Sequence, residues 1–96
     1  MTAEEKIKKE SIVKKYLQGL FPGCDVQTKW DFDSNDLLFR IDENDGQIKH
    51  RGKVTYELLD DTATENIAAE LDKRRLRSLL EKAGRNGVLI SSLKET

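Results

Sequence analysis

The sequence has few of the residues that usually carry catalytic, redox or metal chemistry. Its 96 residues include one cysteine, one histidine, one proline and one tryptophan. A single cysteine excludes an internal disulfide, and Cys24 with His50 supplies too few ligands for a zinc site. We expect Cys24 to be a half-buried structural thiol and His50 to be a surface residue. No glycine-rich phosphate loop is present either, so the sequence predicts a protein that is not an enzyme and has no cofactor.

Long apolar runs are also absent. None approaches the roughly 20 residues that a membrane-spanning helix needs. The opening stretch, MTAEEKIKKES, lacks the apolar segment of a secretion signal, so we expect a soluble, cytoplasmic protein. Charged residues make up 36%, but they nearly cancel to a net charge of −1, which argues against disorder. The length predicts one domain over residues 1–96, with frayed ends at 1–10 and 92–96.

Apolar periodicity divides the chain into helices and strands. A helix is expected from the Thr2–Glu5 capping box to about Gly19, where Pro22 and Gly23 prevent its continuation. Alternating runs then predict strands from residue 26 to 33, from 37 to 42 and from 47 to 59, the last one interrupted by a bulge or bend at Gly52. Residues 47–52 are either strand or loop. Trp30 and Phe32 fall on the apolar side of the first run and are expected in the core.

A second helix is expected over residues 62–83, with a Thr62–Glu65 capping box and Gly84 as its end. The short apolar run 87–91 is a candidate for a fourth strand. The order α-β-β-β-α, with a possible final β, predicts an α+β fold: an antiparallel three-stranded meander with two helices packed on one face. Double-stranded RNA-binding domains share this order. They place lysines at the start of the second helix, where this chain has Asp60, Asp61 and Glu65, so these residues argue against membership of that family.

The apolar pattern of the second helix shifts between Leu71 and Leu76, which predicts a bend or a second apolar face. A straight helix over 62–83 would be about 33 Å long, whereas three strands span about 15 Å. Leu76, Leu79 and Leu80 would then overhang the sheet. The C-terminal segment, a second copy of the chain or another protein could cover them, and a second copy or another protein is the favoured interpretation.

The stretch DFDSNDLLFRID contains a weak candidate for a metal site. Asp31, Asp33, Asn35 and Asp42 have nearly the ligand spacing of a calcium loop. Asp36 stands where such a loop requires glycine, and the flanking runs are strand-like instead of helical. The favoured interpretation is a hairpin turn whose polar side chains cap backbone groups.

Basic residues cluster in the second helix and after it. They are Lys73, Arg74, Arg75, Arg77, Lys82 and Arg85. Such a cluster suits nucleic-acid phosphates or an acidic protein surface. The favoured alternative is a solvated helix face whose arginines pair with Glu70, Asp72 and Glu81. Residues 21–66, which contain the expected sheet, carry a net charge of −6.

These features predict a small binding module that self-associates or binds a protein partner through its second helix. The alternative is a nucleic-acid-binding domain that uses the basic residues of the two helices. No membrane contact is expected.

Overall fold

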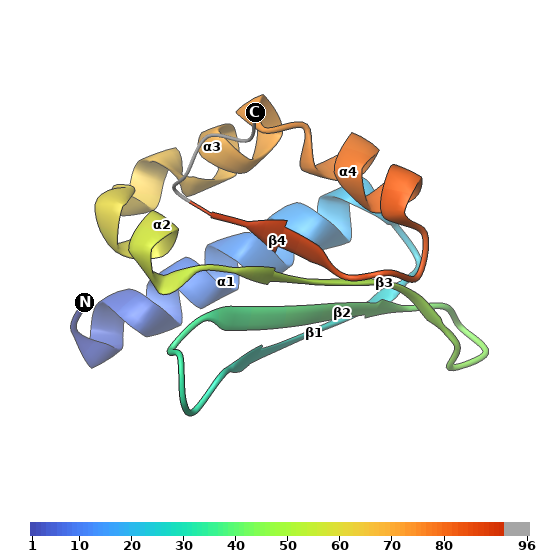
Figure 1. The fold of residues 1–96 in the computed structure, drawn as a ribbon, viewed down its shortest axis with the longest axis horizontal. Coiled ribbons are helices and arrows are strands. Elements are labelled where there is room, and N and C mark those ends of the chain that lie inside the picture. Colours follow the sequence, from blue (N-terminus) through green and yellow to red (C-terminus); the bar gives the residue numbers. More distant parts are fainter. Residues whose placement is uncertain (92–96) are drawn as a thin grey trace.

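The computed structural model describes residues 1–91 and forms a small α+β domain, as predicted (Figure 1). Its elements, in chain order, are α1 (Ala3–Leu20), β1 (Asp25–Trp30), β2 (Leu37–Asp42), β3 (Ile48–Val54), α2 (Tyr56–Asp61), the short 3-10 helix η1 (Thr64–Asn66), α3 (Ile67–Lys73), α4 (Leu76–Ala83) and β4 (Val88–Ile90). Among the described residues, no helix is both long and apolar enough to span a membrane.

The sheet has four strands in the order β1-β2-β3-β4. The first three strands are antiparallel neighbours, as the meander predicts. The run at 87–91 supplies the fourth strand, which pairs in parallel with β3 because the intervening helices return the chain to the same end of the sheet. The prediction of a three-stranded antiparallel sheet is therefore incomplete, and the sheet is mixed.

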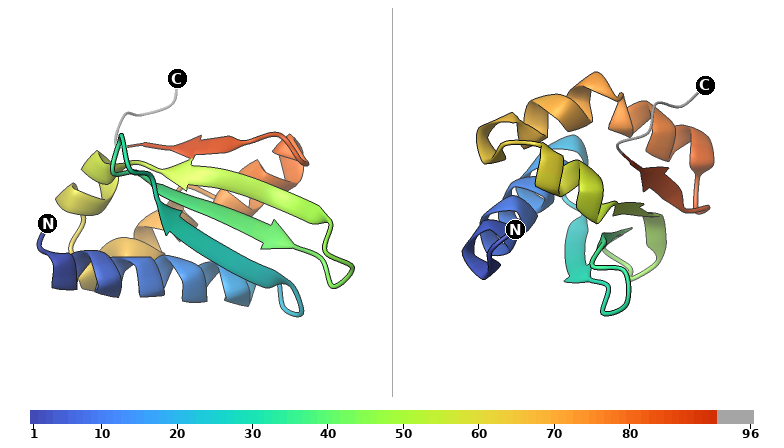
Figure 2. Two further views of the ribbon diagram at one scale, coloured as in Figure 1. Left: turned by 90° about the horizontal axis from the view of Figure 1, so that it is seen from below. Right: turned by 60° about the vertical axis from the view of Figure 1, so that its left-hand side comes forward.

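The helices cover one face of this sheet (Figures 1 and 2). Helix α1 packs on β1 and β2, α4 packs on β3 and β4, and α3 packs on α1. The core between the two layers contains Val13, Leu17, Phe21, Val26, Leu37, Phe39, Ile41, Val54, Leu58, Leu59, Ile67, Leu71, Leu76, Leu80 and Ile90. No helix within residues 1–91 covers the opposite face of the sheet, which is called the open face below.

Capping and turn residues act where the sequence predicts them. Thr2 caps α1, since its Oγ1 accepts a hydrogen bond from the Glu5 amide at 3.1 Å. Gly23 and Gly46 have φ of +85° and +86°, so the turns at both positions use the left-handed region that glycine tolerates. The predicted turn between β2 and β3 is confirmed, because the Gly46 amide donates to the Glu43 carbonyl at 2.9 Å.

The third strand begins at Ile48 and ends at Val54, so residues 48–52 are strand and the predicted extension to residue 59 is wrong. Thr55 accounts for the difference. Its Oγ1 accepts a hydrogen bond from the Leu58 amide at 3.3 Å and starts α2. The predicted cap at Thr62 is also wrong, because Thr62 is the extended residue that follows α2.

The predicted second helix is broken between α3 and α4. Arg75 adopts a left-handed conformation, with φ 56° and ψ 47°, directly before Leu76. The shifted apolar pattern therefore marks a real change of direction. Gly84, with φ 61°, ends α4 as predicted, and its amide donates to the Leu80 carbonyl at 3.0 Å.

This break removes the predicted overhang. At 1.5 Å per residue, α3 and α4 are each only about 10–12 Å long, shorter than the sheet is wide. Leu76 and Leu80 are 0% exposed, and Leu79 packs half-buried against the core. The expectation that the three leucines overhang the sheet is wrong, because they contact this chain's own core.

Four single-residue expectations have mixed outcomes. Cys24 is half-buried, as expected. His50 is only 5% exposed, so its assignment to the surface is wrong; it faces the helices and packs against the ring of Phe21. Trp30 is half-buried against the core, but Phe32 is 97% exposed because β1 ends before it.

Candidate functional site

The open face of the sheet carries a basic and apolar surface, which we call the open-face cluster. It consists of Lys29 on β1, Leu38 and Arg40 on β2, Arg51 and Lys53 on β3, and Leu89 on β4. These residues alternate with core residues along each strand, so their side chains point away from the helices. The register aligns Lys29, Leu38, Lys53 and Leu89 in one row across the sheet.

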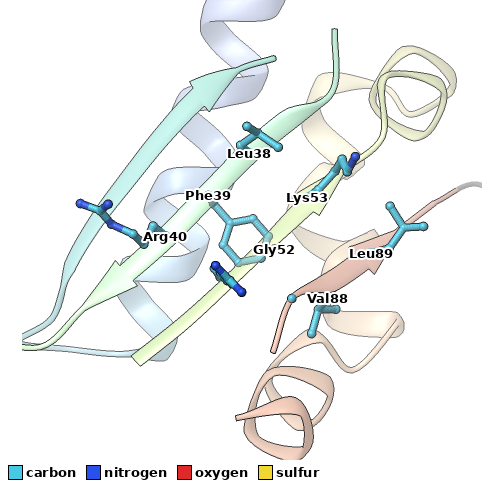
Figure 3. A pocket seen from close by; sticks show the side chains of 9 residues that line it. Leu38, Phe39, Arg40, Gly52, Lys53, Val88 and Leu89 are labelled. Atoms are coloured by element: carbon cyan, nitrogen blue, oxygen red, sulfur yellow. The ribbon is translucent and has the colours of Figure 1, made fainter. Parts of the chain in front are cut away.

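A shallow hollow of about 410 Å³ lies within this cluster (Figure 3). Its lining consists of Leu38, Phe39, Arg40, Arg51, Gly52, Lys53, Gly87, Val88 and Leu89. Figure 3 shows Lys53 between Leu38 and Leu89, with Arg40 farther along β2. The arrangement offers apolar surface surrounded by cationic groups.

The positive charges of this surface are only partly compensated. Arg40 has its Nε 3.0 Å from Asp42 Oδ1, and it also donates to Gln27. The Lys53 ammonium lies 3.8 Å from an Asp36 carboxylate oxygen.

Arg51 and Lys29 are the least compensated of these cations. Within residues 1–91, neither Arg51 nor Lys29 has an ion pair or a side-chain hydrogen bond. Arg51 stands directly opposite Arg40 in the register, and like charges at such positions repel each other. The open face therefore carries positive charges that the described residues do not neutralise.

Gly52 lies in the lining of the hollow and allows close packing beneath it. The predicted bulge at this position is wrong, since Gly52 pairs regularly with Phe39 and Val88, and the register shift lies at Ile41 and Asp42. A Cβ atom on Gly52 would lie 2.5 Å from Phe39 Cζ and 2.7 Å from the Val88 carbonyl oxygen. Only glycine therefore lets the Phe39 ring lie against β3 while β4 pairs beside it.

A second hollow, of about 490 Å³, lies at the C-terminal end of α1. Cys24 and His50 both line it, a proximity that their sequence positions do not suggest. His50 Nδ1 lies 2.9 Å from the Gly84 carbonyl oxygen, and a carbonyl only accepts, so Nδ1 carries the proton. This bond ties β3 to the end of α4, which gives the buried histidine a structural role.

The four metal-ligand candidates are not brought together. Asp31, Asp33 and Asn35 lie in the turn between β1 and β2, whereas Asp42 lies at the far end of β2 and pairs with Arg40. Within residues 1–91, no group of three or more acidic, histidine or cysteine side chains is placed to hold a metal ion.

Three of the six basic residues in and after the broken helix have side-chain partners within residues 1–91. Arg74 pairs with Glu70 at 2.9 Å, and Arg77 pairs with Glu81 at 3.0 Å, as the solvated-face interpretation expects. Arg74 also donates to the Ser91 carbonyl. Of the other members of this cluster, Lys73 ends α3, Arg75 occupies the break, Lys82 lies in the last turn of α4, and Arg85 donates to Gln47.

The open-face cluster was not among the sequence-based candidates, although its signal is present in the strand alternation. Lys29, Arg40, Arg51 and Lys53 all occupy outward positions of their strands. The sequence does not reveal the register of the strands, nor that β4 pairs with β3 and brings Leu89 to this face. Searches of protein-family models, of curated proteins and of solved structures find no match to this chain.

Proposed function

We propose that this protein is a non-enzymatic binding module whose open-face cluster binds an acidic segment of a partner protein that also carries an apolar side chain. The observation that carries the proposal is the placement of Arg40 directly opposite Arg51 beside an apolar hollow. This assignment moves the binding surface from the second helix, whose leucines are buried, to the sheet.

The charge arrangement supports an anionic partner. Two opposed arginines destabilise a free sheet, and carboxylates placed between them would remove that repulsion. Arginine binds carboxylates in a bidentate manner and is enriched among the residues that dominate protein interfaces. Arg51 and Lys29, which have no ion pair within residues 1–91, are the most available of the cations.

The apolar part of the surface supports a protein partner over a nucleic acid. Single-stranded nucleic acids usually stack their bases on aromatic side chains of a sheet surface. No aromatic residue of the described chain extends outward from the middle of the open face. Leu38 and Leu89 instead offer the aliphatic contacts that anchor protein side chains.

Selection from random peptides displayed on phage tests this proposal. We expect the wild-type protein to enrich peptides with an apolar residue flanked by aspartate or glutamate. Those peptides should not bind the Arg40→Glu/Arg51→Glu variant. The matched control is Lys8→Glu/Lys15→Glu, which changes the net charge equally on the exposed surface of α1 and should retain binding.

Two outcomes contradict the proposal. One is a selection that enriches no acidic motif, and the other is a motif whose binding survives Arg40→Glu/Arg51→Glu. A single-stranded oligonucleotide serves as the competing probe. If it binds the open face more tightly than the selected peptides do, the nucleic-acid function replaces the proposed one.

A further inference from the structure

We infer that the open-face hollow binds the turn between β1 and β2 of a second copy of this chain. The inference rests on the proposed function, because it identifies an acidic, apolar partner segment with one that the protein itself carries. That segment is the turn 31–36, which has the sequence DFDSND and is called the acidic turn below.

The acidic turn presents an unusually exposed apolar side chain. Phe32 is 97% exposed, more than either of the other large exposed apolar residues, Ile7 and Leu89. Asp31 and Asp33 flank Phe32 on both sides. An aromatic ring between two carboxylates is the kind of segment that the open-face cluster is equipped to bind.

The acidic turn is also held in a defined shape. The Asp31 amide donates to the Asp36 carbonyl at 2.8 Å, and the Asn35 amide donates to the Asp31 carbonyl at 2.9 Å. The Asp33 amide donates to Asp31 Oδ1 at 2.9 Å, and Lys6 Nζ donates to Asn35 Oδ1 at 3.2 Å. A segment that is already ordered loses less conformational entropy when it binds.

The turn and the hollow are chemically complementary. The Phe32 ring can cover Leu38 and Leu89, and an aromatic side chain of this size buries about 150–250 Å². The carboxylates of the turn would reach the side of the sheet where Arg51 lacks an ion pair within residues 1–91. Both the apolar and the ionic requirements of the hollow are met by one segment.

The placement of the two surfaces favours a closed dimer. In Figure 1 the acidic turn, drawn in teal at the lower left, extends below the sheet and away from α3 and α4. The open face is also the side without helices. When two copies face each other through their open faces, each turn can therefore reach the hollow of the other copy, as a two-fold interface requires.

Sedimentation equilibrium of the full chain tests the inference. We expect a monomer–dimer equilibrium whose dissociation constant rises at least about tenfold in Phe32→Ser and in Asp33→Lys, because each change removes an anchor of the contact. The dimer should also weaken at high salt, because its ion pairs lie at the rim of the interface. Ile7→Ser, which alters another exposed apolar residue on α1, is the control and should not affect it.

A mixing experiment separates this contact from general damage to the fold. Phe32→Ser keeps an intact hollow, and Arg40→Glu/Arg51→Glu keeps an intact turn. Neither variant should dimerise alone, but their mixture restores one of the two contacts and should form a heterodimer. A strictly monomeric wild type, or a dimer that is indifferent to Phe32→Ser, overturns the inference.

Peptide binding distinguishes a failure of this inference from a failure of the proposed function. Phe32→Ser should still bind the selected acidic peptides through its hollow. If it does so while the wild type is monomeric, the second copy is not the occupant and the proposed function stands. If Arg40→Glu/Arg51→Glu affects neither peptide binding nor dimerisation, both conclusions fail.

Discussion

Replacing Gly52 by alanine tests whether the packing beneath the hollow is as described. The new Cβ would lie 2.5 Å from Phe39 Cζ, 2.8 Å from Phe39 Cε2 and 2.7 Å from the Val88 carbonyl oxygen. Carbon atoms in favourable contact are about 3.5–4.0 Å apart. Either the Phe39 ring must leave its position in the core, or β4 must separate from β3.

The expected cost follows from two opposing effects. Adding a methyl group to a fully packed site costs about 1–3 kcal/mol. Alanine recovers about 0.5–1 kcal/mol, because glycine loses more conformational freedom on folding. The three contacts shorter than 3.0 Å put the first effect in the upper part of its range, about 2–3 kcal/mol. We therefore expect Gly52→Ala to lower the free energy of unfolding by about 1–2.5 kcal/mol, which corresponds to a Tm lower by roughly 4–20 °C in a domain of this size.

Urea unfolding followed by far-UV circular dichroism measures this change. A double-mutant cycle with Phe39→Leu identifies its origin, because the smaller side chain should partly relieve the clash and make the two changes non-additive. Gly19→Ala is the control: nothing lies within 4 Å of its new Cβ, and alanine should stabilise α1 by about 0.5–1 kcal/mol. A Gly52→Ala variant as stable as the wild type, or strictly additive effects with Phe39→Leu, would refute the packing argument.

Three further predictions concern the core, the helix break and the acidic turn. Leu76→Ala should cost about 2–5 kcal/mol in urea unfolding and Leu79→Ala clearly less, because only Leu76 is fully buried; equal losses would contradict the burial of α4. Arg75→Gly should stabilise the protein by up to about 1 kcal/mol, because glycine adopts the left-handed conformation without strain, and a destabilised variant would argue against this conformation. The backbone amide of Asp33 holds the pKa of Asp31 below its usual value, so this contribution to turn stability is full above the ordinary pKa of 3.8 and is lost as pH falls through the lowered value. An NMR titration of the Asp33 amide should show its inflection below pH 3.8, and an inflection above that pH would contradict the hydrogen bond.

Local signals were sufficient for much of the fold. Thr2 caps the first helix because its hydroxyl needs only a neighbouring amide three residues away. Gly46 fixes the turn between β2 and β3 through its own backbone conformation. Such features depend on contacts within a few residues, so the sequence predicts them directly.

The path of the second helix could be predicted only in part from local sequence patterns. The spacing of five between Leu71 and Leu76 indicated a change of direction but not its size. The left-handed Arg75 turns both leucines into one core, and it does so because tertiary burial outweighs the cost of that conformation. The assumption of a straight helix, by contrast, led to the prediction that Leu76 and Leu80 form a binding surface.

The open-face cluster depends on information that no single strand contains. Each of Lys29, Arg40, Arg51 and Lys53 is recognisable as an outward residue of its own strand. The register alone places Arg40 opposite Arg51, and the parallel strand β4 alone brings Leu89 beside Lys53. Averaging over residues 21–66 concealed the surface as well, because most of the acidic side chains lie in the turns and in α2, whereas the basic side chains lie on the strands.

The proposed function requires the open face to bind acidic, apolar protein segments. Amide chemical-shift mapping with a selected peptide, recorded on the Phe32→Ser variant so that self-association does not compete, tests it most directly. We expect changes in amide chemical shift centred on residues 38–40, 51–53 and 87–89, and we expect these changes to vanish in Arg40→Glu/Arg51→Glu. Shifts confined to α3 and α4, or an unchanged response in the arginine variant, would contradict it.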